Sequence, residues 1–597
     1  MSHSSFRIRA AVAATAFAAA PPALASLDDV VSVVAIEGQT PAGLGESLRS
    51  FGLPVLNNLG QSAFVYGTPS KNQQGIALAT PTGFANLVSA GQASPDGNGV
   101  LQSFEAIEAG QSGFAYQVAL NDQNQIAFRG SLGSSNLGGD DNFGLFKTDG
   151  SNLQLVAREG QSVPDGNGTF GDFFENIRFN QRGDVAFIVD IENFAPPRNT
   201  FMHVFRGDGQ ALTPIVLSEQ PDGDNRIVGP RDLALNDSGA VSYAFDRQIA
   251  GTFEQPLGIH DGSGFVQYTS GSAPIGGGLG LAGLTGAEGR TVVNNNGQVA
   301  FFATLSGTDG TGMSNSGVFL ADENGPQMLV QEGVDFPLDP VFGSVDDLQS
   351  LGGSIAINDA GQVAFATSGG IYRIDDSGLT RVLSNGDLAL DGNGTYITSN
   401  GSVHGYSSIA LNDSGQMAFQ LTHQTNVPGT LDAIYLYDDT DGLIQVAREG
   451  ESFLGSTIQD LRFLADNTAG VEGNGFNDAG QIAFRFQLTD GRDGIGLYEA
   501  NRIVLAGDYD ASGQVEQGDL NLVLSNWGVD TAAAGVPTGW LNDLPEGLID
   551  QAELNAVLSN WGAQAAGLGS AVTVPEPTGA LAAGVGGLLR CRRRRHG

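Results

Sequence analysis

Short apolar runs alternate with polar turns along most of this chain, and this region shows no helical periodicity. The motif N-x-x-G-x-x-A-F occurs eight times, six times intact, at intervals of about 60 residues. The copies begin at Asn57, Asn121, Asn180, Asn236, Asn294, Asn358, Asn412 and Asn477. Repetition at a fixed period predicts an array of similar structural units.

The motif itself predicts a β-hairpin. In the copy at 412–419, apolar runs flank a type I turn that ends at Gly415, where a positive φ makes a G1 bulge. Asn412 can accept a hydrogen bond from the backbone two residues on. In the second copy Asn124 replaces the glycine, and Asn tolerates left-handed backbone geometry best after Gly.

Each unit carries two further strand patterns, so it holds about four short strands. Four-stranded units repeated around a ring predict an all-β repeat domain, a β-propeller of seven or eight blades. An open β-solenoid is the alternative, although its coils are usually shorter. The first unit lacks a strand that residues 494–498 can supply, so we expect the last strand to complete the first blade.

A segment near the C-terminal end has the spacing of an EF-hand-type calcium loop, with oxygen ligands converging around a turn glycine, Gly513. The predicted ligands, in loop order, are Asp508, Asp510, Ser512, Gln514 (through its backbone carbonyl), Glu516 and Asp519. We therefore expect bound Ca²⁺; the alternative is a plain Asp-Gly turn.

Two helices with matching apolar spacing belong to this segment, and both end in Asn-Trp-Gly, with Gly as the C-terminal cap. Their apolar positions are Leu520, Val523, Leu524 and Trp527 in one, and Leu554, Val557, Leu558 and Trp561 in the other. The second loop, 542–553, has Leu544 at a ligand position, so its site is weak or lost. This duplicated loop–helix pattern resembles a dockerin, which implies two antiparallel helices and a cohesin-like partner.

Both ends of the chain carry targeting patterns. Residues 1–25 combine Arg7 and Arg9, a short apolar run and Ala23-Leu24-Ala25, which predicts a secretory signal peptide. The other end has Val574-Pro575-Glu576-Pro577, a short Gly-rich apolar stretch and an arginine cluster, and it resembles the PEP-CTERM sorting signal. That resemblance implies cleavage by an exosortase and display at the surface or in the extracellular matrix of a Gram-negative-type bacterium.

Charge and composition exclude some classes of partner. The net charge of -38 repels phosphate backbones, so no nucleic acid partner is expected. The single cysteine, Cys591, permits no intramolecular disulfide. The apolar stretch 579–589 contains several glycines, so we expect no stable transmembrane span in the mature protein.

Other candidates are weaker. Three equivalent runs, 95–99, 164–168 and 391–394, read Asp-Gly-Asn-Gly and predict turns, with cation binding as the alternative. The histidines show no ligand spacing and are expected at the surface or in loops. No nucleophile elbow, zinc-protease motif or phosphate loop is present, but the many acids could include a glycosidase pair.

The sequence thus predicts a signal peptide (1–25), a repeat propeller (26–505), a dockerin-like module (506–563), a linker (564–573) and a sorting signal (574–597). Residues 30–504 resemble the bacterial tandem N-x-x-G-x-x-A-F proteins, a resemblance that implies architecture and location but no activity. We expect a secreted, surface-displayed, non-catalytic binding or structural protein whose partner is a cohesin-like protein or an extracellular polysaccharide. The alternative is an extracellular carbohydrate-active enzyme on a propeller scaffold.

Overall fold

The computed structural model describes residues 27–41, 44–70, 74–80, 83–104, 118–133, 143–195, 202–218, 226–229, 233–249, 252–276, 279–284, 291–306, 316–331, 354–367, 369–397, 409–425, 430–465, 474–500, 506–510, 514–531, 537, 539–540 and 547–563. The signal peptide, linker and sorting signal that the sequence predicts lie outside these residues.

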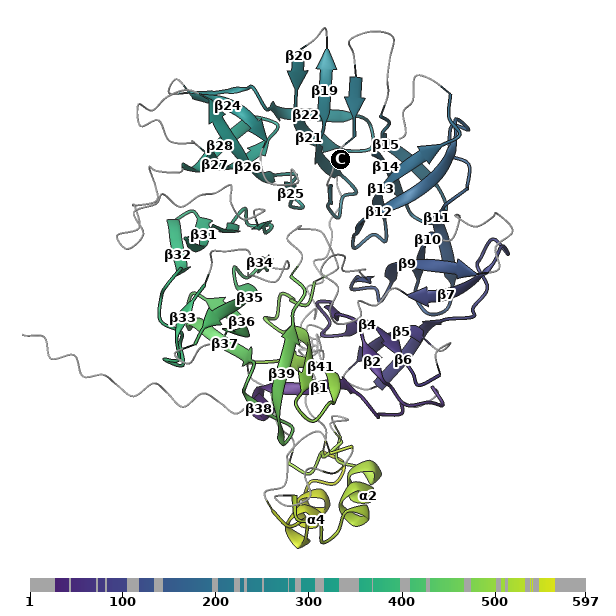
Figure 1. Ribbon diagram of the computed structural model, residues 1–597, viewed down its shortest axis with the longest axis vertical. Coiled ribbons are helices and arrows are strands. Elements are labelled where there is room, and N and C mark those ends of the chain that lie inside the picture. Colours follow the sequence, from purple (N-terminus) through teal and green to yellow (C-terminus); the bar gives the residue numbers. More distant parts are fainter. Residues whose placement is uncertain are drawn as a thin grey trace, which may run out of the picture.

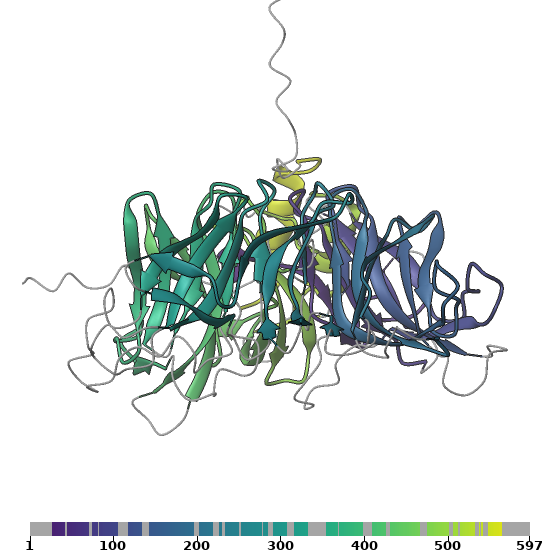
Figure 2. The same ribbon diagram turned by 90° about the horizontal axis from the view of Figure 1, so that it is seen from above.

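Eight antiparallel sheets stand around a central axis as the blades of a β-propeller (Figure 1), and the edge-on view shows a flat disc (Figure 2). The propeller prediction is confirmed, and of the two blade numbers eight is correct because every repeat builds one blade.

The strands of the first four blades follow the chain order. Blade 1 contains β2 (Ser50–Phe51), β3 (Val55–Leu56), β4 (Ser62–Gly67), β5 (Gln74–Thr80) and β6 (Gly83–Ser89). Blade 2 contains β7 (Val100–Phe104), β8 (Ala119–Leu120), β9 (Ile126–Gly133), β10 (Phe143–Thr148) and β11 (Leu153–Arg158). Blade 3 contains β12 (Thr169–Phe179), β13 (Val185–Glu192), β14 (His203–Gly207) and β15 (Leu212–Val216). Blade 4 contains β17 (Ala234–Leu235), β18 (Val241–Ala244), β21 (Pro256–His260) and β22 (Phe265–Ser270), beside a small sheet of β16 (Arg226–Val228), β19 (Asp246–Ile249) and β20 (Thr252–Glu254).

The other four blades complete the ring. Blade 5 contains β23 (Pro274–Gly276), β24 (Leu279–Leu284), β25 (Thr291–Val293), β26 (Val299–Ser306), β27 (Ser316–Asp322) and β28 (Gly325–Gln331). Blade 6 contains β29 (Ile355–Ile357), β30 (Val363–Ala366), β31 (Gly370–Asp375) and β32 (Gly378–Ser384). Blade 7 contains β33 (Thr395–Tyr396), β34 (Ile409–Leu411), β35 (Met417–Gln424), β36 (Thr430–Asp438) and β37 (Gly442–Arg448). Blade 8 contains β38 (Ser452–Phe453), β39 (Ser456–Arg462), β40 (Ile482–Leu488), β41 (Asp493–Tyr498) and the N-terminal β1 (Val31–Ile36), which follows α1 (Leu27–Val30).

The ring closes where the two ends of the repeat region meet in one sheet. Strand β1 pairs antiparallel with β41, with Val31 opposite Tyr498 and Ile36 opposite Gly494. The expectation that the last strand completes the first blade is wrong. Residues 50–89 already supply a full first blade, so the first strand completes the last one.

The repeat motif forms the predicted hairpin in each blade. Gly415 has a φ of 80°, its N–H donates to the Asn412 carbonyl at 3.0 Å, and Asn124 takes the same role with a φ of 61°. The Ala-Phe pair that follows is buried, as are its replacements Ser242 and Tyr243. The apolar clusters join strands of adjacent blades, as between Val55 of blade 1 and Phe128 of blade 2. Packing between blades therefore forms the core.

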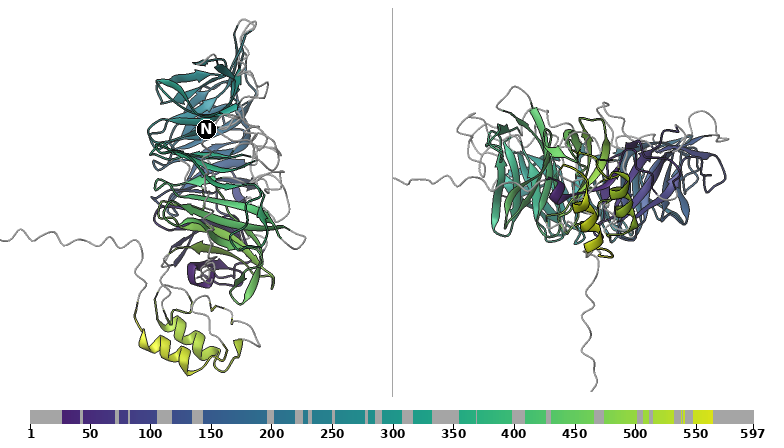
Figure 3. Two further views of the ribbon diagram at one scale, coloured as in Figure 1. Left: turned by 90° about the vertical axis from the view of Figure 1, so that its left-hand side faces the viewer. Right: turned by 90° about the horizontal axis from the view of Figure 1, so that it is seen from below.

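Two helices lie at one edge of the disc, next to blade 8 (Figures 1 and 3): α2 (Gln517–Ser525) and α4 (Gln551–Ser559). The two helices pack against each other. Beyond each helix the chain passes through a glycine with positive φ, Gly528 after α2 and Gly562 after α4. Among the described residues, no helix combines the length and apolar character that a membrane crossing requires.

Candidate functional site

The asparagine of each repeat links its blade to the next. Its side-chain amide donates a hydrogen bond to the carbonyl oxygen of the equivalent asparagine in the following blade. The last bond runs from Asn477 back to Asn57, so the eight bonds, of 2.9 to 3.4 Å, form a closed cycle. The predicted bond within the turn is also present, since Asn57 Oδ1 accepts from Leu59 N at 3.1 Å.

The residue after each asparagine forms a second closed cycle, which we call the axial ring. Each backbone N–H donates to a side-chain oxygen of the ring residue in the next blade, at 2.8 to 3.0 Å. The ring residues are Asn58, Asp122, Gln181, Asp237, Asn295, Asp359, Asp413 and Asp478. The sequence analysis missed this ring, although an amide or carboxylate at the same position of all eight copies was a usable signal.

Five of the eight ring residues are aspartates, and their negative charges repel one another. Burial, together with the charges of Asp359 and Asp122, raises the pKa of Asp237. Burial and neighbouring ring carboxylates raise the pKa of Asp413 in the same way. Asn295 moderates the repulsion because its amide donates to Asp237 at 2.9 Å and to Asp359 at 3.0 Å. One oxygen of each acid already accepts a backbone N–H, so these carboxylates hold blades together.

The Asp-Gly-Asn-Gly runs are turns, as predicted, and two of them also connect blades. Asp96 Oδ1 accepts from Asn98 N at 3.0 Å, and its other oxygen pairs with Arg158 of the next blade at 2.8 Å. Asp391 pairs with Arg448 in the equivalent position.

The predicted calcium loop brings three of its candidate ligands together. One oxygen each of Asp508, Asp510 and Asp519 lies within 4.8 Å of the others. Asp519 is fully buried, and its carboxylate accepts backbone N–H groups from Tyr509 (2.6 Å), Asp510 (3.1 Å) and Glu516 (2.8 Å). Burial raises the pKa of Asp519, and the charge of Asp510 adds to this effect, while the backbone bonds oppose it. A cation at this point would relieve that repulsion.

The remaining predicted ligands are less fully described. Ser512 lies outside the described residues, as do Asn542, Leu544 and Glu546 of the second loop. Gln514 precedes the buried Val515, and Glu516 caps the start of α2. A Cβ at Gly518 would lie 2.3 Å from Asp510 Oδ2, so a larger residue there would displace the carboxylate of this candidate ligand.

Matching pairs of backbone hydrogen bonds link the two halves of the C-terminal module (506–563). Val515 of the first loop accepts from Gly562 N at 2.8 Å and donates to the Ala563 carbonyl at 3.0 Å, just beyond α4. Ile549 of the second half makes the same pair of bonds, at 2.8 and 2.9 Å, with Gly528 and Val529 beyond α2. The loop that carries the acids is therefore fixed by the opposite helix.

The apolar faces of α2 and α4 are only partly covered. Val523 and Val557 are fully buried in a small core with Tyr509 and Trp540. The four outer positions stay exposed, at 54%, 47%, 55% and 49%: Leu524, Trp527, Leu558 and Trp561. The four apolar positions predicted for each helix therefore include a duplicated, exposed Leu–Trp pair.

Comparisons with known proteins give fold-level likenesses at low identity. The β-propeller domain of the trilobed protease from Pyrococcus furiosus aligns with 66% of this chain and 98% of its own, at 9% identity and a TM-score of 0.33. The WD40 domain of SCAP from fission yeast aligns over 78% and 97%, at 9% identity and a TM-score of 0.33. An α-L-arabinanase from Penicillium chrysogenum, solved with arabinobiose, aligns over 69% and 99%, at 11% identity and a TM-score of 0.25. A comparison with the curated proteins found no match.

One family model covers the repeat region. It matches residues 23–200 and 178–501, which together include every copy of the motif and all eight blades. The chain therefore belongs to the family described as "Family of unknown function (DUF7453)".

Proposed function

We propose that this is a secreted, surface-displayed, non-catalytic binding protein in which a calcium-dependent dockerin-like module docks the propeller to a partner. The observation that carries the proposal is the convergence of Asp508, Asp510 and Asp519 within a small module. Oxygen ligands in this arrangement suit Ca²⁺. Among the described residues of the module, six buried apolar side chains form its core, and so small a core commonly needs a metal to remain folded.

The exposed Leu–Trp pairs support a docking role. Large side chains exposed together on adjacent helices favour a protein–protein contact, and Trp is enriched at the centres of such contacts. The duplicated arrangement offers a partner two equivalent surfaces, one on α2 and one on α4. A cohesin-like protein is the partner we propose, with an extracellular polysaccharide as the alternative.

The enzyme alternative remains second. It needs two carboxyl groups that face a substrate, and the axial ring is the place where acids gather around the propeller axis. Each ring acid already accepts a backbone N–H from the preceding blade, which favours a structural role. Incubation of the mature chain with a glycan panel and a hydrolysis readout tests this alternative.

Calorimetric titration of the mature chain with CaCl₂ tests the calcium proposal. We expect one site, and we expect Asp508→Ala to abolish binding because the first loop position anchors the ion. Glu553→Ala is the matched control, since it removes the equivalent carboxylate of the second half and should leave the site intact. Two equal sites would contradict the proposed loss of the second loop, and no binding at millimolar calcium would contradict the calcium role.

The localisation proposal rests on the two terminal patterns and is tested in the host. Mass spectrometry should find the protein outside the inner membrane with both ends removed. Cytoplasmic material that retains Met1 would contradict secretion.

A further inference from the structure

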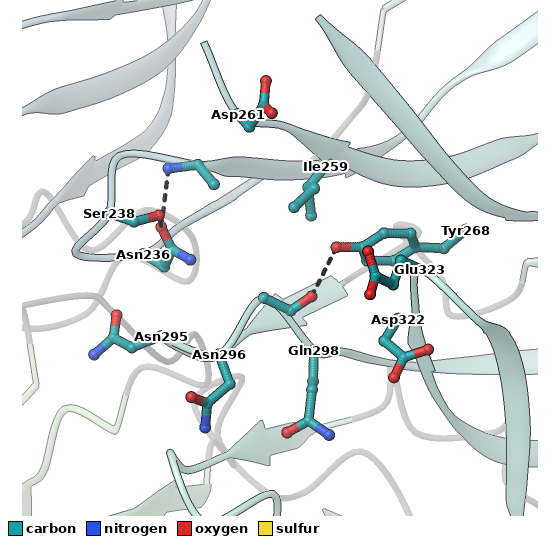
Figure 4. A pocket seen from close by; sticks show the side chains of 12 residues that line it. Asn236, Ser238, Ile259, Asp261, Tyr268, Asn295, Asn296, Gln298, Asp322 and Glu323 are labelled. Carbon is teal, nitrogen blue, oxygen red and sulfur yellow. Dashed lines mark hydrogen bonds between the residues drawn. The ribbon is translucent and has the colours of Figure 1, made fainter. Parts of the chain in front are cut away.

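A polar pocket of about 580 Å³ lies between blades 4 and 5 (Figure 4). Each blade contributes six of the lining residues, from its N-x-x-G turn and from the end of its third strand, with Tyr268 of β22 in addition in blade 4. Ile259, Asp261 and Tyr268 come from blade 4, while Asp322 and Glu323 come from blade 5. A volume of this size is in the range that accommodates small molecules.

The pocket exists because blade 4 departs from the repeat. In six copies a glutamine directly follows the fourth residue of the motif, which is normally the turn glycine. The glutamine side chain lies over the turn glycine of the next blade. A Cβ on Gly415 or Gly480 would lie 2.7 or 2.8 Å from the Oε1 atom of the glutamine in the preceding blade. Blade 4 has Ala240 instead, and a Cβ on Gly297 would meet only Tyr268 Oη at 3.6 Å and Ile259 Cδ1 at 3.8 Å.

Tyr268 forms one wall in place of the missing glutamine. Its hydroxyl donates to the Gly297 carbonyl at 3.0 Å and so bridges the two blades. Burial, followed by the charges of Asp322, Glu323 and Asp261, raises the pKa of Tyr268. Figure 4 shows Asp322 and Glu323 beside Tyr268. The Asp261 carboxylate points away from them and accepts from Ser263 N and Gly264 N of its own turn, at 2.8 and 3.2 Å. Ile259 and the tyrosine ring supply apolar surface.

No lysine or arginine is among the lining residues. Arg206 of blade 3 reaches the same junction, but its guanidinium donates to the Gly239 carbonyl and does not line the pocket. With the described residues, Asp261, Asp322 and Glu323 form no ion pair. Their oxygens do not converge as the Asp508 group does, so they suit a ligand of several atoms better than a bare metal ion.

We propose that this pocket binds an organic cation, with an ammonium group on an aliphatic stem. Asp322 and Glu323 face the ammonium, Asp261 adds negative charge to the pocket lining, and Ile259 and Tyr268 pack along the methylene groups. An anionic ligand is repelled, and a neutral one leaves the carboxylates without a counter-charge.

Titration of the mature chain with cadaverine tests the proposal, with 1,5-pentanediol as a neutral probe of the same length. We expect saturable binding of cadaverine that weakens with added salt, and none of the diol. Ala240→Gln restores the side chain that six other blades carry and should lower the affinity at least tenfold without lowering the melting temperature. Glu323→Gln should lower it several-fold, whereas the exposed Asp441→Asn, which removes the same charge from blade 7, should not.

Three results would overturn the proposal. The first is cadaverine binding by Ala240→Gln at native affinity. The second is binding of pentanediol, or of neutral glycans, as tight as that of cadaverine. The third is the absence of saturable cadaverine binding up to about 10 mM, the weak limit for a specific small-molecule site.

Discussion

The propeller and the C-terminal module (506–563) are both built by repetition, but their folds are stabilised differently. The propeller closes eight blades with two cycles of hydrogen bonds and with apolar clusters between neighbouring blades. Among its described residues, the module has two copies of one unit, a core of six buried side chains and three acids gathered beside it. Eight copies can bury their own edges around a ring, whereas two copies cannot, so we expect the smaller unit to depend on a bound ion.

This difference predicts separate sensitivities. Damage to ring closure should unfold the propeller and leave the module's calcium response intact. Removal of calcium should unfold the module and leave the propeller intact. The predictions below test this separation.

The largest effect should follow removal of β1. A mature chain that starts at Glu37 loses Leu27, Val31, Val33 and Ile36 from the blade 8 core and exposes the edge of β41. Four buried aliphatic side chains correspond to roughly 6 to 12 kcal/mol of stability. We expect the propeller's thermal transition to fall sharply or disappear in calorimetry, relative to a chain that starts at Ser26. An unchanged transition would mean that β1 does not close the ring.

Calcium removal should have the next largest effect, and only on the module. Saturation at a thousandfold excess over Kd stabilises a folded site by about 4 kcal/mol, which chelator removes. We expect chelator to abolish the module's transition in the native chain, and Asp508→Ala to have no calcium-dependent transition. The propeller's transition should stay within error in both cases. A propeller transition that moves with calcium would break the comparison.

The sequence predicted the propeller well because its main signal is local. A type I turn with Gly or Asn at positive φ depends on a few adjacent residues, and the structure confirms it at Gly415 and Asn124. Closure was predicted only in part. To predict which blade β1 joins, one must count the strands of the first unit. One of them, β2, has only two residues and is therefore easily missed in the sequence.

Contacts between units were the part that the sequence could not give. The axial ring joins residues of different blades, so nothing inside one copy reveals its partners. His203, expected at the surface or in a loop, is fully buried in β14, and its Nδ1 accepts from Ser218 N at 3.1 Å. In the module, helical spacing could not tell which apolar positions would be buried, since Val523 is buried and Trp527 is exposed.

A third, smaller effect should come from the turn glycine of a single blade. Gly415 has a φ of 80°, which Val adopts only with strain and Asn tolerates. We expect Gly415→Val to cost about 2 kcal/mol or more and Gly415→Asn about 1 kcal/mol less than that. A Cβ here meets only the flexible Gln362 side chain, so both variants face the same steric contact. Equal losses in melting temperature would contradict the G1-bulge geometry as the reason for glycine.

The smallest effect should appear as a pH dependence confined to the propeller. Burial, followed by the charges of Asp432 and Asp460, raises the pKa of Glu449 to about 7. A carboxyl group whose folded pKa is raised contributes stability below its unfolded pKa and loses it as pH rises through the folded value. The native propeller should therefore lose stability between about pH 4.5 and 7, and Glu449→Gln should flatten this loss by about 1 kcal/mol. Melting temperatures in saturating calcium at pH 5 and 8 measure the change, with the exposed Asp441→Asn as a charge-matched control. The same pH dependence in Glu449→Gln as in the native chain would assign the loss to other carboxylates, such as those of the axial ring.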